Sequence, residues 1–463
     1  MKTASMGNKF YAVVLAAGEG VRMCSETPKV LHTVAGIPMI ERVLNAVRNT
    51  GVQKVCIVLG HGKDRIEHHI KSHKDFSHVD IVHQKKQLGS ADAFAQARRI
   101  INRKNIHHCL VLCGDTPLIE KSELINLMRM HLAKHASATI LSAQCENPFG
   151  YGRIKREASG AVAAIIEEKD ATESEKKISE INSGMYCFKL SDVLRVLPRI
   201  RPNNVKKEYY LTDAIQLIRQ EGKDVHACCI DDYSRIMGIN DRIQLAQAED
   251  VLRYSVLYAR MRSGVTIIDP SSTYVDETVK IDRDTILHPG VMLKGQTNIG
   301  KSCVIGPQSF IQNSHIAHHV TVRSSYVIDS HIKSRTSIGP FAHVRPGSSI
   351  GPGVKIGNFV EVKNTTIGEA VKAGHLAYLG DADIKKKVNI GAGTIICNYD
   401  GVSKHKTRIG EAAFIGSNVS LVAPVRIGKN SLVAAGSTIT ENIPSGKLAF
   451  ARSRQVIKNK KKR

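Results

Sequence analysis

The stretch IGPFAHVRPGSSIGPGVKIGNFVEV, residues 338–362, decides the fold of the second half of this 463-residue chain. An aliphatic residue stands at every sixth position of the stretch, and the same spacing recurs before and after it. The repeating positions are Ile281, Leu287, Leu293, Ile299, Ile305, Ile311, Ile338, Val344, Ile350, Ile356, Val362, Ile409, Ile415, Leu421, Ile427, Val433 and Ile439. An α-helix repeats about every 3.6 residues and a β-strand about every two, so neither has this period. A coil that turns three times per circuit does have it, and we predict a parallel β-helix.

The first half of the chain has a different pattern, in which short apolar runs alternate with helical spacing. The apolar runs that we predict to be buried strands are residues 10–18, 54–60, 79–84 and 109–115. Residues 38–49 and 122–134 have the spacing of helices. This alternation is typical of a doubly wound, largely parallel α/β sheet. Ligands bind such sheets beyond the carboxyl ends of the strands, which here are residues 15–18 and 113–115.

The sequence predicts three segments. Residues 1–241 form the α/β domain, residues 242–262 have the pattern of a connecting helix, and residues 263–463 hold the hexads. The hexads lose their phase at residues 397–408, with the sequence CNYDGVSKHKTR. A loop that leaves an otherwise regular prism is a candidate functional site.

Composition limits the classes of function. The net charge of +24 would suit a nucleic-acid or membrane-surface binder, but the basic residues are spread along the chain apart from the tail at 458–463. We interpret this tail as a solvated terminus and the remaining charge as suited to phosphorylated small molecules. No run is long enough to span a bilayer, and Phe10–Ala17 is typical of a strand rather than a secretory signal. Ten cysteines without zinc-finger spacing favour a reduced, cytoplasmic protein.

A glycine-rich turn with two basic residues follows the first predicted strand. Gly18 and Gly20 would let backbone N–H groups approach phosphates, while Arg22 and Lys29 would supply positive charge. A glycine-rich turn by itself more often has no function beyond reversing the chain, but together with Arg22 and Lys29 it favours nucleotide binding. Residues 295–302, GQTNIGKS, also match the P-loop pattern, and we reject that match because they keep the phase of the hexads.

Four further residues each have a possible chemical role beside a plainer interpretation. Asp115, at a strand end, can hold Mg²⁺ against a polyphosphate or simply form a turn. Gln84 and Gln87 can read the edges of a base or belong to a solvated loop. His375 can act as a general base, although most of the chain's 20 histidines must have other roles.

The motifs together resemble a known family. In order they are LAAGEGVRM with Pro28-Lys29, QKKQLGSADA, CGDTPL, NPFGYGRI, IIEEKDAT, EINSGMY, GINDR, VRPGSSIG, GNFVEVKN, KAGHLAYLGDADI, VNIGAGTIICNYDG, FIGSN, LVAAGS and FARSR. They resemble the bacterial bifunctional UDP-N-acetylglucosamine pyrophosphorylases/glucosamine-1-phosphate N-acetyltransferases, over nearly the whole chain. The resemblance implies acetylation of glucosamine-1-phosphate by acetyl-CoA, then UMP transfer from UTP, supplying peptidoglycan and lipopolysaccharide precursors. It further implies a cytoplasmic homotrimer with a left-handed β-helix and no nucleic-acid or membrane partner.

The resemblance also implies residues for the first site. Those around the UTP phosphates would be Leu15, Ala16, Ala17, Gly18, Arg22 and Lys29, with Cys113 and Gly114 beside them. Those on the uracil side would be Gln84, Gln87, Gly89 and Ser90. Gly152, Glu167 and Asn182 would hold the amino sugar. Asp115 and Asn240 would coordinate Mg²⁺. No protein nucleophile is needed, because positioning and charge neutralisation supply most of the rate.

The second site implied by the resemblance centres on His375 as the general base, with Glu361 orienting or polarising its imidazole. The residues that would bind the sugar phosphate and the sugar are Arg345, Lys363, Tyr378 and Asn389. Those that would line the acetyl-CoA groove are Gly391, Ala392, Gly393, Asn398, Tyr399, Ser417, Ala435 and Arg452.

The chain departs from the family pattern at three places. Cys113 replaces a frequent aromatic residue, and Asp92 stands where we expect a histidine. Lys385–Lys387 replaces a glycine-bearing corner, for which we expect a locally distorted coil. None of these removes a residue that is assigned to the chemistry.

Two other functions compete with the bifunctional one. The β-helix could serve only assembly or regulation beside a single nucleotidyltransferase activity, but His375, Arg345 and Lys363 argue against this. The layout also occurs in translation-initiation-factor subunits that act as binding proteins. The intact Gly18/Arg22 turn and Asp115 favour catalysis instead.

Overall fold

The computed structural model describes residues 6–102 and 106–459. The chain forms two compact units, whose boundary lies between Leu252 and Arg253. This boundary falls inside helix α8 (Arg242–Arg262), which has the bounds that the sequence predicts for the connecting helix.

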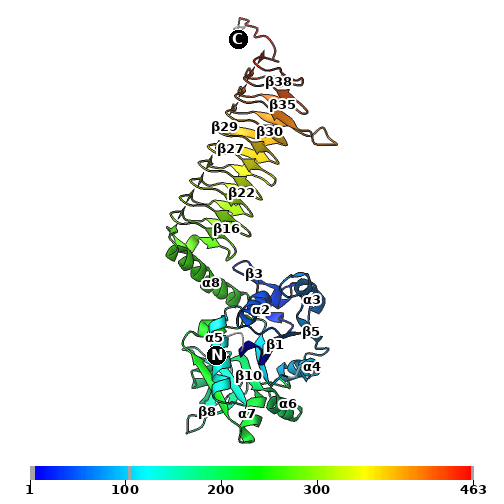
Figure 1. The fold of residues 1–463 in the computed structure, drawn as a ribbon, viewed down its shortest axis with the longest axis vertical. Helices are drawn as coiled ribbons and strands as arrows, with labels where there is room; N and C mark the ends of the chain where they lie inside the picture. The colour runs from blue at the N-terminus through cyan, green and yellow to red at the C-terminus, as the bar shows by residue number, and fades with distance from the viewer. Residues whose placement is uncertain (1–5, 103–105, 460–463) are drawn as a thin grey trace. The chain divides into compact units, whose positions relative to one another are not determined.

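The first unit is built on a twisted sheet, drawn in blue to green in Figure 1. Its seven principal strands, in spatial order, are β11 (Val225–Ile230), β7 (Ala138–Gln144), β10 (Glu180–Lys189), β6 (His108–Cys113), β1 (Phe10–Ala16), β4 (Val55–Leu59) and β5 (Asp80–His83). Strand β10 runs antiparallel to both of its neighbours, and the other pairs are parallel. A hairpin of β8 (Arg153–Arg156) and β9 (Val162–Ile166) extends from β10. The predicted, largely parallel α/β sheet is confirmed; the sequence analysis did not identify the antiparallel strand.

Helices cover both faces of this sheet because its strands are apolar on both sides. Along β1, Ala12 and Val14 belong to one buried cluster, whereas Tyr11 and Val13 belong to another. The helices are α2 (Met39–Asn49), α3 (Lys63–Ser72), α4 (Ser90–Asn102), α5 (Lys121–Ala133), α6 (Leu190–Val196) and α7 (Asp213–Gln220). Fully buried parallel strands have such continuous apolar runs. The predicted helices at 38–49 and 122–134 correspond to α2 and α5.

The second unit is a stack of three-sided coils, drawn from green to red in Figure 1. Strands on the same side of successive coils pair in parallel, and each side of the stack is one ladder. The first ladder consists of β12 (Thr266–Ile267), β15 (Ile286–Leu287), β18 (Val304–Ile305), β21 (Thr321–Val322), β24 (Ser337–Ile338), the starts of β27 (Lys355–Lys363) and β29 (Lys372–Gly380), β31 (Asn389–Ile390), β34 (Phe414–Ile415), β37 (Leu432–Val433) and β39 (Leu448–Ala449).

The second ladder consists of β13 (Tyr274–Val275), β16 (Met292–Lys294), β19 (Phe310–Gln312), β22 (Tyr326–Ile328), β25 (His343–Val344), the ends of β27 and β29, β32 (Ile395–Cys397), β35 (Ser420–Val422) and β38 (Thr438–Ile439). The third consists of β14 (Lys280–Ile281), β17 (Asn298–Ile299), β20 (His315–Ile316), β23 (His331–Ile332), β26 (Ser349–Ile350), β28 (Thr366–Ile367), β30 (Ala382–Ile384), β33 (Thr407–Ile409) and β36 (Arg426–Ile427). We call the turns after the first, second and third ladders the first, second and third corners.

One apolar column fills this prism. Every aliphatic residue of the predicted hexads is buried, and all of them belong to a single cluster. The unit is therefore the predicted left-handed parallel β-helix, whose handedness is an exception to the usual right-handed crossover. Residues 295–302 run through β17 and a corner of this prism, which confirms the rejection of the P-loop match.

The third corner corrects one prediction. Lys385–Lys387 does not distort its coil, since Ile384 pairs with Ile409 and Lys385 N–H donates to Ile409 O at 2.9 Å. Lys387 adopts φ of +60°, close to the φ of +55° and +54° that Ala370 and Ala412 have at the same corner. The corner requires a residue in the left-handed conformation, which Gly353 supplies after β26 and non-glycine residues such as Ala370, Lys387 and Ala412 supply in other coils.

The hexads lose their phase where the chain leaves the prism. Between β32 and β33 the segment 398–406 forms a loop, closed by a bridge between Tyr399 and Lys404. The ladder continues beneath this loop, because Ala382 pairs directly with Thr407.

Three observations bear on the class of protein. A search of the described residues finds no helix that is both long and apolar enough to cross a membrane. All ten cysteines lie in the described part of the chain, and each is a free thiol. The basic tail is exposed at Lys458 and Asn459, and its remaining residues, 460–463, lie outside the described ones.

Candidate functional sites

The glycine-rich turn lies at the carboxyl end of β1. Arg22 is in the short helix η1 (Val21–Met23), and Lys29 begins η2 (Lys29–Leu31). Gly20 has φ of +67°, and a Cβ atom there would lie 2.7 Å from Lys29 Cβ. Only glycine fits between this turn and the lysine, and so Gly20 allows Lys29 to reach the strand ends.

Lys29 joins the two residues that we predicted as metal ligands. Its Nζ donates to Asp115 Oδ2, just beyond β6, and to Asn240 Oδ1 at 2.9 Å. The backbone brings these oxygens together, because Ile239 N–H donates to Asp115 O at 2.9 Å. The three side chains are therefore one cluster, in which an ammonium group lies between two hard oxygen donors.

A cavity of about 430 Å³ opens beside this cluster. The predicted site residues that line it are Leu15, Arg22, Ser90, Cys113, Asp115, Gly152, Glu167, Asn182 and Asn240. A second cavity, of about 470 Å³, is lined by the predicted residues Leu15, Ala17, Gly18, Gln84, Gln87, Gly89, Ser90 and Cys113. Leu15, Ser90 and Cys113 line both cavities, which are therefore adjacent. Phosphate, base and sugar residues predicted from separate motifs thus meet at one edge of the sheet.

Besides Lys29, two predicted residues of this site line neither cavity. Ala16 is buried, and Gly114 packs against β1, where a Cβ atom would lie 3.1 Å from Ala16 Cβ. Gly114 N–H donates to Leu15 O at 2.8 Å. These two residues hold the ends of β1 and β6 together and so shape the floor of the site.

The predicted sugar-binding residues of the first cavity include one half-buried carboxylate, Glu167. Burial raises the pKa of Glu167, although the Thr212 hydroxyl, which donates to its carboxylate at 3.2 Å, opposes the shift. Asn182 Nδ2 donates to Tyr186 Oη at 2.9 Å. Burial raises the pKa of the Cys113 thiol to about 12, so this thiol stays protonated at neutral pH. The sequence analysis missed Thr212 and Tyr186, although Tyr186 ends the EINSGMY motif.

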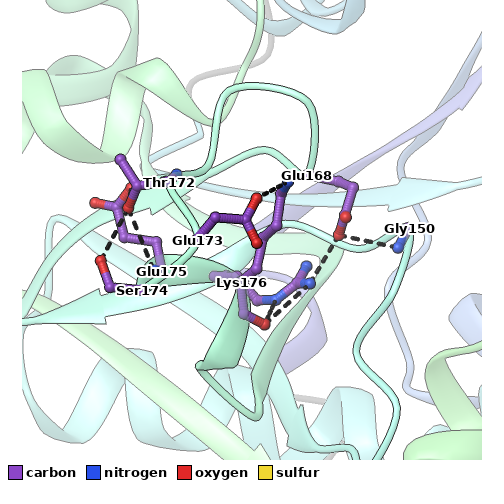
Figure 2. A network of polar contacts seen from close by, with 8 residues as sticks. Gly150, Glu168, Thr172, Glu173, Ser174, Glu175 and Lys176 are labelled. Atoms are coloured by element: carbon purple, nitrogen blue, oxygen red, sulfur yellow. Dashed lines mark hydrogen bonds and ion pairs between the residues drawn. The ribbon is translucent and has the colours of Figure 1, made fainter.

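A polar network holds the loop at Gly150, next to the predicted sugar-binding residues (Figure 2). Glu168 Oε2 accepts from Gly150 N–H at 3.1 Å and from Arg153 Nη2 at 2.7 Å. The buried Arg153 guanidinium also donates to Tyr151 O and Lys176 O. Gly150 and Tyr151 line the cavity, so the ion pair behind them determines the shape of its wall.

In the β-helix, His375 contacts a residue that the sequence analysis did not single out. Its Nδ1 lies 2.5 Å from Asn358 Oδ1, and the two residues are in register on β27 and β29. Glu361, expected to orient the imidazole, instead accepts from Arg345 Nη1 at 2.7 Å and raises the pKa of that guanidinium. The available signal was the repeat itself, because Asn358 precedes His375 by one coil of 17 residues.

The first corner carries His375 and most of the predicted acetyl-CoA residues. Gly393 N–H donates to Leu376 O at 2.7 Å, which places Ala392 one coil after His375. Later coils bring Ser417 and Ala435 to the same corner. Arg452 follows them and donates from Nη1 to Ala435 O at 2.9 Å. The predicted base and thioester-binding residues therefore form one column.

The second corner carries most of the predicted sugar-phosphate residues. Arg345 and Lys363 lie there, and Lys404 of the loop adds a cation that lowers the pKa of Lys363. Asn398 Nδ2 donates to Asp381 Oδ2 at 2.5 Å and lies 3.5 Å from Tyr378 Oη. The remaining two predicted residues are Tyr399, which is exposed in the loop, and Asn389, which begins β31 on the first ladder. Lys404 was not predicted as a site residue.

Fold and sites define the class: a nucleotidyltransferase joined to a hexapeptide-repeat transferase. The Nucleotidyl transferase family model matches residues 11–239, and the Bacterial transferase hexapeptide model matches residues 329–364 and 406–441. Curated relatives named Bifunctional protein GlmU are 48% identical in Alkaliphilus metalliredigens, over 96% of both chains, and 46% in a Geobacillus species, over 97% of both. A relative of that name in Listeria monocytogenes is 45% identical over 97% of both chains. The chain belongs to the family of bifunctional GlmU proteins.

Proposed function

We propose that this chain synthesises UDP-N-acetylglucosamine in the cytoplasm by two reactions, one in each unit. Residues 263–463 transfer the acetyl group of acetyl-CoA to glucosamine-1-phosphate. Residues 1–241 then transfer UMP from UTP to N-acetylglucosamine-1-phosphate and release pyrophosphate. The observation that carries the proposal is the convergence of two independent residue sets, one beyond β1 and β6 and one along the first corner.

In UMP transfer, a phosphate oxygen of the sugar attacks the α-phosphorus of UTP, and pyrophosphate leaves. Arg22 and Lys29 offset the charge of the phosphates, while the two cavities hold the sugar and the base beside them. The half-buried Glu167 and the buried Asn182 orient the sugar through its polar groups. The reaction needs no covalent intermediate with the protein.

We further propose that Asp115 and Asn240 hold Mg²⁺. A carboxylate and an amide oxygen are suitable donors, and both already contact one cation, the Lys29 ammonium. Mg²⁺ accepts few protein ligands, which agrees with the result that no group of three acidic, histidine or cysteine side chains suited to a metal occurs among the described residues. The ion supplies positive charge to phosphate oxygens.

In acetyl transfer, His375 removes a proton from the 2-amino group of the sugar as the nitrogen attacks the thioester carbonyl. Asn358 Oδ1 accepts a hydrogen bond from Nδ1–H, which leaves Nε2 free to take this proton. Arg345, held by Glu361, and Lys363 bind the phosphate of the sugar.

We propose a homotrimer as the active form. The support is that His375 and the proposed acetyl-CoA residues lie at the first corner, whereas the proposed phosphate-binding residues lie at the second corner of the same prism. Phe341, Phe359 and Leu376 project from the first corner beside His375 and are 59%, 57% and 57% exposed. Exposed apolar side chains of this kind are typical of a protein interface. Light scattering at several concentrations measures the assembly, and a fully active monomer would contradict it.

The test of the two reactions uses the purified chain with glucosamine-1-phosphate, acetyl-CoA, UTP and Mg²⁺, each omitted in turn. We expect thiol release without UTP, and pyrophosphate release that depends on the acetylated sugar phosphate. Pyrophosphate release without thiol release, when each half has its own substrate, would reduce the β-helix to a structural role.

A further inference from the structure

The amide of Gln84 is held by two acceptors in the cavity that it lines. Gln84 follows β5, and its side chain is almost completely buried. Its Nε2 donates to Asp92 Oδ2 at 2.7 Å and to Gly89 O at 3.1 Å. Both N–H groups of the amide are thus directed to atoms of the protein.

These two partners decide which way the amide faces. A glutamine amide has a donating and an accepting end of nearly equal size, and its orientation follows from its hydrogen bonds. A carboxylate and a backbone carbonyl can only accept, so both favour the same orientation. The atom with which Gln84 can meet a ligand is then Oε1, an acceptor.

Both partners are themselves held in place. Asp92 lies in the first turn of α4, and Gln96 Nε2 approaches its other oxygen at 3.4 Å. Gly89 has φ of +117°, and a Cβ atom there would lie 2.5 Å from Tyr209 O. The Gly89 carbonyl therefore cannot easily turn away from Gln84.

We propose that Asp92 is a specificity-determining positioning residue, which holds Gln84 Oε1 toward the base and thereby selects uracil over cytosine. Uracil carries an N–H donor at N3, which pairs with Oε1, whereas N3 of cytosine has a lone pair that Oε1 repels. Sites that hydrogen-bond a polar edge reject analogues that lack the matching group. The inference rests on the proposed UMP transfer and concerns how this chain chooses its nucleotide.

The test compares UTP with CTP in the full chain and in the D92N variant. An asparagine at position 92 can donate as well as accept, so only the Gly89 carbonyl still favours the orientation with Oε1 toward the base. The Gln84 amide can then present its N–H₂ to N3 of cytosine more readily than in the wild type. We measure pyrophosphate release with N-acetylglucosamine-1-phosphate and Mg²⁺, and binding of each nucleotide by calorimetry. The ratio of kcat/KM for UTP to that for CTP should fall roughly tenfold, and the ratio of affinities should fall with it.

The matched control is D64N. Asp64 also lies in the first turn of a helix, α3, and is exposed, so this variant loses the same charge from a similar position. It should keep the wild-type ratio. An unchanged ratio in D92N, or an equal loss with both nucleotides, would overturn the inference, since the second result indicates only a structural role. Absence of pyrophosphate release from UTP in the wild-type chain would instead refute the proposed function.

Discussion

Asn358 Oδ1 lies 2.5 Å from His375 Nδ1, and the two residues occupy the same rung of a parallel ladder, one coil apart. Stacking of successive coils therefore orients the proposed general base. Because an amide oxygen can only accept, the contact favours the neutral tautomer that carries its proton on Nδ1 and has its lone pair on Nε2. The acidic partner that we expected, Glu361, is engaged by Arg345 instead.

Replacing Asn358 by leucine should lower kcat for acetyl transfer by about tenfold or more, because the imidazole loses its orientation. KM for acetyl-CoA and the release of pyrophosphate should change little. The matched control is Asn298→Leu, since Asn298 faces His315 in another Asn–His rung that carries no predicted site residue. Equal effects of the two variants on acetyl transfer would show that Asn358 acts through stability alone.

The proposed metal ligands should matter to one reaction only. Asp115→Ala should reduce Mg²⁺-dependent pyrophosphate release roughly 100-fold or more, since a metal supplies several kcal/mol to phosphoryl chemistry. Asn240→Ala should raise the Mg²⁺ concentration needed for half-maximal rate. Thiol release by both variants should equal that of the wild type. Parallel loss of both activities would point to misfolding or obligatory coupling.

The network around Gly150 (Figure 2) provides two glutamates for comparison. Glu168→Gln removes the charge that holds Arg153 and Gly150, and it should raise KM for N-acetylglucosamine-1-phosphate roughly tenfold with KM for UTP unchanged. Glu173→Gln breaks the exposed pair with Lys176, which contributes little to stability. It should leave both KM values unaltered. A similar increase in both variants would contradict the role of the ion pair.

Two histidines should make the first unit sensitive to acid. Burial lowers the pKa of His131 to about 3 and that of His108 to about 4, from an ordinary value of 6.5. Repulsion from His107, Lys9 and Lys189 lowers the pKa of His108 further, and repulsion from His108 and His226 does the same for His131. Below pH 6.5 the unfolded chain therefore binds more protons than the folded chain. The free energy of unfolding decreases as the pH falls.

We expect the urea midpoint of the helical circular-dichroism signal to fall as pH decreases from 6.5 toward 4, because that signal arises largely from the first unit. His131→Gln should make this dependence shallower, while the exposed His78→Gln should not. The same slope in all three proteins would show that the buried pair does not control acid sensitivity.

Periodic features were predictable from the sequence, and contacts across the chain were not. The hexads place one inward-facing aliphatic residue on each side of a coil. The six-residue spacing of positions such as Ile356 and Val362 was therefore enough to predict the β-helix. The apolar runs located β1 and β6 and hence the edge that carries Asp115. The antiparallel β10 has no periodic signature that separates it from its parallel neighbours.

Side-chain partners depend on register, which the motifs alone did not supply. Glu361 is close to His375 in sequence, yet the ladder places it beside His343 and Tyr378, whereas Asn358 is the residue opposite His375. The expected distortion at Lys385–Lys387 was wrong because backbone conformation, rather than glycine, is what that corner requires.

The ladders also determine how many residues this half of the molecule can gain or lose at a time. Ile281 pairs with Ile299 and Val344 with Val362, so each residue in a strand pairs with the residue one full coil further along the chain. Adding or removing one residue within a strand would turn a buried side chain outward, whereas the segment 398–406 shows that extra residues are accepted when they leave from a corner. Such a chain can therefore gain or lose whole coils, or gain residues at its corners, while the apolar core keeps its register.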